Sequence, residues 1–200
     1  MPQLSKNREI PLALTNLRLC YSLRKCGKNK VEDVFDKCED PLLFTYDDQN
    51  ILGYSDWTNK EPEFSSKCFR VNNPNKNTLC LLPLDGRIIT GPHVIRGGVC
   101  DCLLLSEQEM AFVEFKTNVN SPDPLNTFDM ADKAISQLWN TFNIFLKMRV
   151  NMRDLSIDFH VVFDKDYKIT GVNSSFMDLG VKFLKERKYP LSFENEKSFI

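Results

Sequence analysis

The chain has 200 residues, of which 42% are hydrophobic and 26% are charged, and its formal net charge is −1. This length and ordinary globular composition predict one domain with a sizeable core. Two histidines exclude a metal centre built from several imidazoles, and no apolar run approaches the roughly 18 residues of a membrane span.

Basic and acidic residues are unevenly distributed, although their totals nearly cancel. Residues 1–30 carry seven Lys or Arg against one acid, residues 31–66 carry two against ten acids, and residues 67–100 carry five against one acid. The first and third blocks could meet a polyanion such as DNA. The alternative is that each block is an ordinary solvated surface.

Seven cysteines occur without a Cys-x-x-Cys pair or another zinc-ligand spacing. No apolar segment of the secretory type follows the basic start. We therefore expect a reducing compartment, the cytoplasm, and no membrane partner. Cys100 and Cys102 flank Asp101, and we expect both to point away from the Asp101 face as small core residues.

In chain order, residues 1–30 form a basic N-terminal extension, in which a helix over residues 12–25 ends near Gly27. The apolar residues of 31–38 recur at helical spacing, which predicts a short amphipathic helix. Residues 39–78 make a long polar connection with scattered aromatic residues. Such a connection is either functional or contains short strands.

From residue 79 onward the apolar pattern becomes regular. The predicted strands are residues 79–82, 99–105, 110–116 and 157–163, and the predicted helices are residues 126–149 and 172–188. Asn126 or Thr127 is the expected N-cap of the first of these helices. A long helix between strands favours an α/β fold, a central mixed β-sheet flanked by helices.

The whole chain is then one domain. Residues 1–30 are its N-terminal extension, residues 31–163 its core, and residues 164–200 a C-terminal helix and tail.

Charged residues interrupt the apolar strands mainly at Asp101, Glu114 and Lys116. If residues 99–105 and 110–116 pair as a hairpin, Asp101 lies nearly opposite Glu114, with Lys116 on the same side. Two such carboxylates repel each other unless a cation lies between them. An alternative is a structural salt bridge on a half-exposed sheet.

Oxygen-rich ligation by Asp101 and Glu114, to which the backbone carbonyl of Phe115 could add, suits Mg²⁺ or Mn²⁺. Lys116 could orient or deprotonate a water molecule, or neutralise charge that builds on a phosphate.

The spacing Gly98-x-x-Asp101, then Glu114-x-Lys116, then a long helix bearing Gln137, resembles the PD-(D/E)XK nuclease superfamily, particularly its RecB-like branch. The resemblance implies a restriction-endonuclease-like core. It also implies that Asp101 and Glu114 bind metal, that Lys116 serves the attacking water, and that Gln137 supports the site.

This resemblance covers residues 93–163 and, more loosely, residues 31–38. In the family, a helix before the sheet often donates a further acid, and Glu32, or else Asp36, is the candidate for it here. Thr141 stands where the RecB-like branch usually has a Tyr, four residues after the Gln.

The activity that the resemblance implies is that of a Mg²⁺- or Mn²⁺-dependent endonuclease hydrolysing phosphodiester bonds in DNA. Arg87, Arg96 and the basic N-terminal residues would contact the phosphate backbone. Two alternatives stay open. One is a non-catalytic subunit of the same fold whose acidic stretch 31–66 binds a separate partner protein, and the other is an RNA-directed nuclease. A homodimer is a further option.

Overall fold

A six-stranded mixed β-sheet forms the centre of the computed structural model, which describes residues 9–48, 51–91, 96–118, 124–166 and 173–200. Its strands, in spatial order, are β1 (Asp36–Cys38), β5 (Leu79–Pro83), β6 (Cys102–Leu105), β7 (Glu109–Lys116), β8 (Ser156–Phe163) and β9 (Leu191–Ser192). The first four pair antiparallel, whereas β7, β8 and β9 run parallel. The expected α/β class with a mixed central sheet is confirmed.

A second sheet of four strands arises mainly from residues 39–78. In spatial order it contains β10 (Glu196–Ser198), β4 (Phe69–Asn72), β2 (Leu42–Asp48) and β3 (Tyr54–Thr58). A single 3-10 turn, η1 (Ser65–Lys67), precedes β4. The long connection therefore contains short strands, and the expected C-terminal tail supplies two more, β9 and β10.

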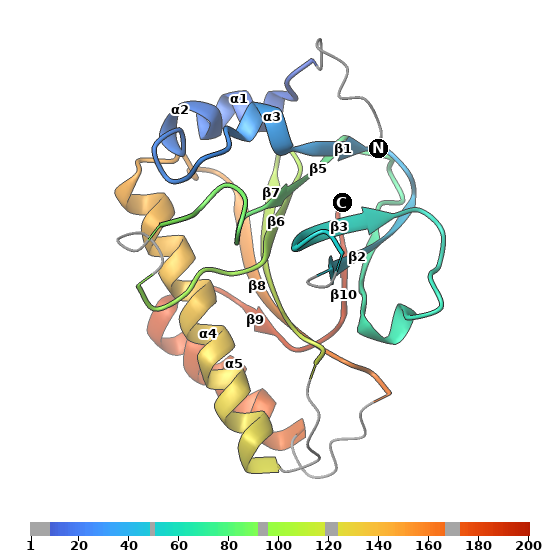
Figure 1. The fold of residues 1–200 in the computed structure, drawn as a ribbon. Helices are drawn as coiled ribbons and strands as arrows, with labels where there is room; N and C mark the ends of the chain where they lie inside the picture. Colours follow the sequence, from blue (N-terminus) through green and yellow to red (C-terminus); the bar gives the residue numbers. More distant parts are fainter. Residues whose placement is uncertain (1–8, 49–50, 92–95, 119–123, 167–172) are drawn as a thin grey trace.

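Two helices join the parallel strands of the larger sheet. α4 (Pro124–Lys147) connects β7 to β8, and α5 (Asn173–Arg187) connects β8 to β9. Parallel neighbours need such crossovers, because the chain must return to the same end of the sheet. Figure 1 shows both helices on one face of the larger sheet and the second sheet on the other.

The larger sheet is buried on both faces, which explains why its strands read as continuous apolar runs. Leu103 and Phe112 pack in the core beneath the helices, whereas their neighbours Leu104 and Val113 pack in the core against the second sheet. This two-sided burial leaves a charged side chain in these strands little access to water, so each one has to be compensated inside the protein.

The N-terminal region differs from its prediction in two places. The helix expected over residues 12–25 is split into α1 (Leu12–Asn16) and α2 (Leu19–Ser22), because Arg18 adopts a left-handed conformation with φ 55°. The helix expected over residues 31–38 stops after α3 (Val31–Val34), since the chain becomes extended at Phe35 and pairs with β5 as β1. Backbone pairing with β5 therefore overrode the helical spacing.

The two long helices differ from their predictions in detail. α4 begins at Pro124, two residues before the expected cap at Asn126, and proline suits a first turn because it lacks the N–H that would go unpaired there. α5 spans Asn173–Arg187, which differs by one residue at each end from the predicted range 172–188. Among the described helices, none combines the length and apolarity needed to cross a membrane.

A buried ion-pair network fastens the C-terminus to the larger sheet. Lys197 of β10 donates from Nζ to Glu109 Oε2 at 2.7 Å and to Asp158 Oδ2 at 2.8 Å. Burial alone would lower the pKa of Lys197, but these two carboxylates raise it above its ordinary value. The side chain of Lys197 is 9% exposed, and Lys197 is the cation that the two acids share, while His160 Nε2 also lies 3.4 Å from Asp158 Oδ1.

We predict that Lys197→Ala lowers the free energy of unfolding by about 3 kcal/mol, because it strands two largely buried carboxylates. Lys67→Ala is the matched control, since Lys67 is 45% exposed and lies 3.8 Å from Asp164, and it should cost less than about 0.5 kcal/mol. Urea denaturation measures both. Equal losses for the two variants would contradict a structural role for the Lys197 network.

Candidate active site

The two strands expected to carry the acidic residues do pair as an antiparallel hairpin, β6 with β7. Cys102 lies opposite Val113 in this ladder. Asp101 immediately precedes Cys102, and Glu114 immediately follows Val113, so the register brings the two acids together at one end of the hairpin.

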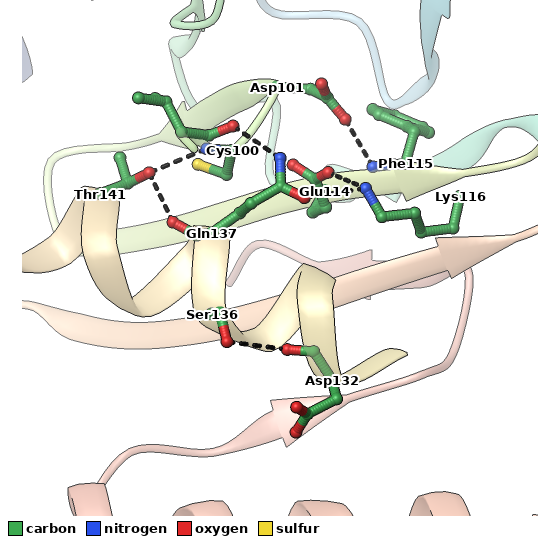
Figure 2. A network of polar contacts seen from close by, with 10 residues as sticks. Cys100, Asp101, Glu114, Phe115, Lys116, Asp132, Ser136, Gln137 and Thr141 are labelled. Atoms are coloured by element: carbon green, nitrogen blue, oxygen red, sulfur yellow. Dashed lines mark hydrogen bonds and ion pairs between the residues drawn. The ribbon is translucent and has the colours of Figure 1, made fainter. Parts of the chain in front are cut away.

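Asp101 is held by backbone groups of neighbouring strands. Its Oδ2 accepts a hydrogen bond from the Phe115 N–H at 2.6 Å (Figure 2), and its carbonyl oxygen accepts one from the Leu84 N–H at 2.8 Å. The residue is only 7% exposed. The orientation of its carboxylate is therefore set by β7, while the end of β5 fixes its main chain.

Cys100 and Cys102 are buried, as expected, but they do not share a face. Cys100 belongs to the core beneath the helices, and Cys102 belongs to the core against the second sheet. The prediction assumed that regular strand alternation included both residues. The regular alternation begins only at Cys102, because the chain before β6 follows an irregular path against α4.

Glu114 and Lys116 meet Gln137 of α4 (Figure 2). Lys116 donates from Nζ to Glu114 Oε1 and, at 3.0 Å, to Gln137 Oε1. Glu114 is 1% exposed, and its second oxygen, Oε2, is buried with no hydrogen-bond partner among the residues that the structure describes. The structure thus brings three of the four expected site residues into one set of contacts, with Asp101 as the residue just before β6.

Three side chains of α4 hold the segment that leads into Asp101. Gln137 donates from Nε2 to the Val99 carbonyl at 3.1 Å, and Asn140 donates from Nδ2 to the Gly98 carbonyl. Thr141 Oγ1 accepts from the Cys100 N–H at 2.8 Å and donates to the Gln137 carbonyl at 2.8 Å. Thr141, at the position where the RecB-like branch has a Tyr, therefore contacts the site through the backbone.

Asn140 and Thr141 were not among the expected site residues. Their spacing from Gln137, three and four residues, places all three on one face of a helix. This spacing was the available signal, but nothing in the sequence indicated that the face would meet residues 98–100.

Gly98 permits this contact between the loop and the helix. Its φ is +83°, and a Cβ at this position would lie 2.7 Å from Gln137 Cγ. Any other residue would therefore be strained in its backbone and would also displace Gln137. The glycine observed before Asp101 in the sequence thus has a steric reason.

Burial makes the ionised forms of Asp101 and Glu114 costly. Burial raises the pKa of Asp101 well above its ordinary value, and the carboxylate of Glu114 raises it further. Burial likewise raises the pKa of Glu114 to about 7, even though Lys116 acts to lower it. One ammonium group is thus insufficient to compensate the charge of both carboxylates.

Two further acids add to this excess of negative charge and were missed in the sequence. Asp47 of β2 helps to raise the pKa of Asp101, and Asp85 helps to raise that of Glu114. Asp85 follows β5 and donates its N–H to the Asp101 carbonyl at 3.3 Å. Neither acid was among the expected site residues, because Asp85 lies after the strand predicted over residues 79–82 and Asp47 lies within the long connection of residues 39–78.

The helical acids expected to supplement the site have other neighbours. Glu32 lies beside Cys20, whose pKa it helps to raise, although burial is the larger cause. Asp36 accepts a hydrogen bond from the Trp57 indole at 2.8 Å and lies on β1, not on a helix.

Metal ligation can be assessed from the donors present. No group of three or more His, Cys, Asp and Glu side chains arranged for a metal occurs in the described part of the chain. The candidate set is smaller, the carboxylates of Asp101 and Glu114 with the Phe115 carbonyl. Its oxygen donors, its excess negative charge and the unpartnered Glu114 Oε2 fit a hard divalent cation.

No protein-family model, no curated protein and no solved structure matches this chain.

We predict that the metal-free protein loses stability as pH rises from about 5 to about 7. Glu114 keeps its proton in the folded state up to a pKa of about 7, whereas the unfolded carboxyl ionises near 4.5, so deprotonation favours unfolding across this window. The total loss of unfolding free energy across this window amounts to at most about 3 kcal/mol. Glu114→Gln should flatten this pH dependence, whereas Glu107→Gln, in the exposed turn, should not. Urea titrations in EDTA at several pH values measure this, and identical slopes in both variants would contradict it.

We also predict that Gly98→Ala costs about 3 kcal/mol of unfolding free energy, combining backbone strain with a clash against Gln137. Gly53 provides the matched control, because its φ is +72° but no atom lies within 4 Å of an added Cβ. Gly53→Ala should therefore cost only about 1 kcal/mol. The difference, measured by chemical denaturation, isolates the packing contribution, and equal losses would show that Gln137 yields without cost.

Proposed function

We propose that this protein is a metal-dependent nuclease that hydrolyses phosphodiester bonds in DNA. The observation that carries the proposal is the contact of Lys116 with both Glu114 and Gln137, next to the buried carboxylate of Asp101. Buried carboxylates with raised pKa values beside a lysine, at the end of a strand pair, are typical of catalytic sites.

Asp101, Glu114 and the Phe115 carbonyl are the residues that would hold Mg²⁺ or Mn²⁺. The metal, when bound, supplies positive charge that stabilises the negative charge developing on the phosphate. Burial is the main cause of the raised pKa values of both acids, and neighbouring carboxylates add to it. The raised values support this assignment, because a bound cation would favour the ionised forms that burial disfavours.

Lys116 is the residue that would orient the attacking water and carry positive charge toward the phosphate. Its Nζ is fixed between Glu114 Oε1 and Gln137 Oε1, and Gln137 is itself anchored to the Val99 carbonyl. Gln137 therefore acts as a positioning residue for the Lys116 ammonium group. The side chain of Lys116 is 14% exposed, against 2% for Glu114, so Lys116 is the more accessible group of this ion pair.

The same proposal includes the type of fold around the site. We propose a restriction-endonuclease-like core, supported by the order of an Asp before one strand, a Glu-x-Lys on the next, and a Gln on the helix after it. All seven cysteines are free thiols, which supports a reducing compartment such as the cytoplasm.

DNA contact would involve the basic segment beside the site. Arg24, Lys25, Lys28 and Lys30 are exposed, and Asn29 donates to the Arg87 carbonyl at 3.1 Å. This contact joins the basic segment to the loop that carries Asp85. Arg87 is stacked on Tyr54, with its guanidinium carbon 3.9 Å from the ring centroid, whereas Arg96 is exposed. Such contacts recognise phosphates without reading bases.

The test is hydrolysis of plasmid, single-stranded DNA and RNA by the purified full chain with Mg²⁺ or Mn²⁺. Asp101→Asn, Glu114→Gln and Lys116→Ala should each lower the rate at least about 100-fold, and EDTA should abolish hydrolysis. Lys182→Ala, an exposed cation on α5, should keep the wild-type rate.

Equal rates for wild type and Lys116→Ala would overturn the catalytic assignment. Hydrolysis of RNA but not of DNA would show that RNA is the substrate. Absence of hydrolysis, together with no heat of Mg²⁺ or Mn²⁺ binding in calorimetry, would favour a non-catalytic interaction subunit.

A further inference from the structure

A cavity of about 620 Å³ lies at the C-terminal end of α4, away from Asp101 and Glu114. It is bounded by the junction of α1 and α2, by residues 149–153, by the start of β8 and by Tyr189. Figure 1 shows α1 and α2 beside this end of α4.

The cavity combines an apolar floor with a cationic rim. Phe142 and Ile157, both nearly buried, form the floor with the ring of Tyr189, whose centroid is 5.0 Å from that of Phe142. Arg18, Arg149 and Arg153 line the rim and are exposed.

The three rim arginines have no acidic counterpart. No Asp or Glu lines the cavity, and within the described parts of the chain none of the three guanidinium groups forms an ion pair. Cations near a helix C-terminus stabilise its dipole, which accounts for Arg149. The dipole of α4 does not account for Arg18, which lies at the junction of α1 and α2.

The backbone around the rim is fixed in an uncommon conformation. Arg18 and Arg149 have φ values of 55° and 59°, in the left-handed region where glycine or asparagine is usual. The Asn151 N–H donates to the Leu17 carbonyl at 3.1 Å, which joins the two turns. Arg18 and Arg149 therefore project from two turns whose backbones are joined to each other.

Two carbonyls near the end of α4 are already occupied by backbone N–H groups. The Ile144 carbonyl accepts from the Met148 N–H at 2.8 Å, and the Phe145 carbonyl accepts from the Val150 N–H at 3.0 Å. An anion in the cavity would thus face guanidinium groups, whose paired donors match the oxygens of a phosphate.

We infer that this cavity binds a nucleotide, with its phosphate on Arg18, Arg149 and Arg153 and its base against Tyr189 and Phe142. A phosphate ester attached to a flat aromatic ring satisfies both halves of the cavity, whereas inorganic phosphate satisfies only the rim. The inference does not depend on the nuclease proposal, because no residue of the cavity belongs to the candidate active site. The nucleotide can be free or the 5′-terminal nucleotide of a strand.

The test is calorimetric titration of the full chain, in EDTA, with AMP, adenosine, inorganic phosphate, and one oligonucleotide carrying either a 5′-phosphate or a 5′-hydroxyl. AMP should saturate one site, and adenosine and phosphate should each bind at least about tenfold more weakly. Arg18→Gly and Arg149→Gly should each weaken AMP binding at least about tenfold. Glycine suits the left-handed backbone, so both variants should keep the wild-type melting temperature.

Lys147→Ala is the matched control. It removes an exposed cation from the same helix end, but from outside the cavity, and should change AMP affinity less than about twofold. Tyr189→Ala should reduce AMP affinity to that of phosphate. Binding of the 5′-phosphorylated strand alone, lost in Arg149→Gly, would identify a strand end as the ligand. No binding of either probe, or an equal loss in Lys147→Ala and Arg149→Gly, would overturn the inference.

Discussion

The close approach of Gly98 to Gln137 determines how the rest of the candidate site is arranged. With a Cβ excluded at this position, the loop lies against α4, and Gln137, Asn140 and Thr141 reach the main chain of residues 98–100. This contact directs the chain into β6. The site is therefore held by a long helix and the central sheet, which are its most rigid neighbours.

Burial on both faces of the larger sheet makes the charged residues at its end costly. Asp101 and Glu114 both have raised pKa values, and Lys116 provides the only ammonium group in contact with Glu114 among the described residues. A chain selected for stability alone would place apolar residues there. The retained carboxylates are the physical reason for proposing a function at this end of the hairpin, and a bound cation would offset their repulsion.

Charges of opposite sign occupy different parts of the surface along α4. Acidic groups gather near Gln137, in the middle of the helix, whereas the cavity with Arg18, Arg149 and Arg153 lies at its C-terminal end. A near-zero net charge conceals this separation, because the two sets cancel in the total. An anionic ligand is therefore attracted to the cavity with the three arginines, and it is repelled from the acidic groups near Gln137 unless a metal is bound there.

Local signals in the sequence were sufficient to predict α4, α5 and the strands at residues 79–82, 110–116 and 157–163. They were also sufficient to predict that Asp101 lies opposite Glu114. Both kinds of signal, periodicity and hairpin register, act over short separations in the chain. They were insufficient where distant segments compete. Backbone pairing with β5 converted half of a predicted helix into β1, and the second sheet was assembled from short strands with weak periodicity.

The sequence by itself determined which residues carry the charges of the site. Only the tertiary structure decided that α4 would lock the loop before Asp101 and that Asp47 and Asp85 would lie near the site, since these contacts join residues far apart in the chain.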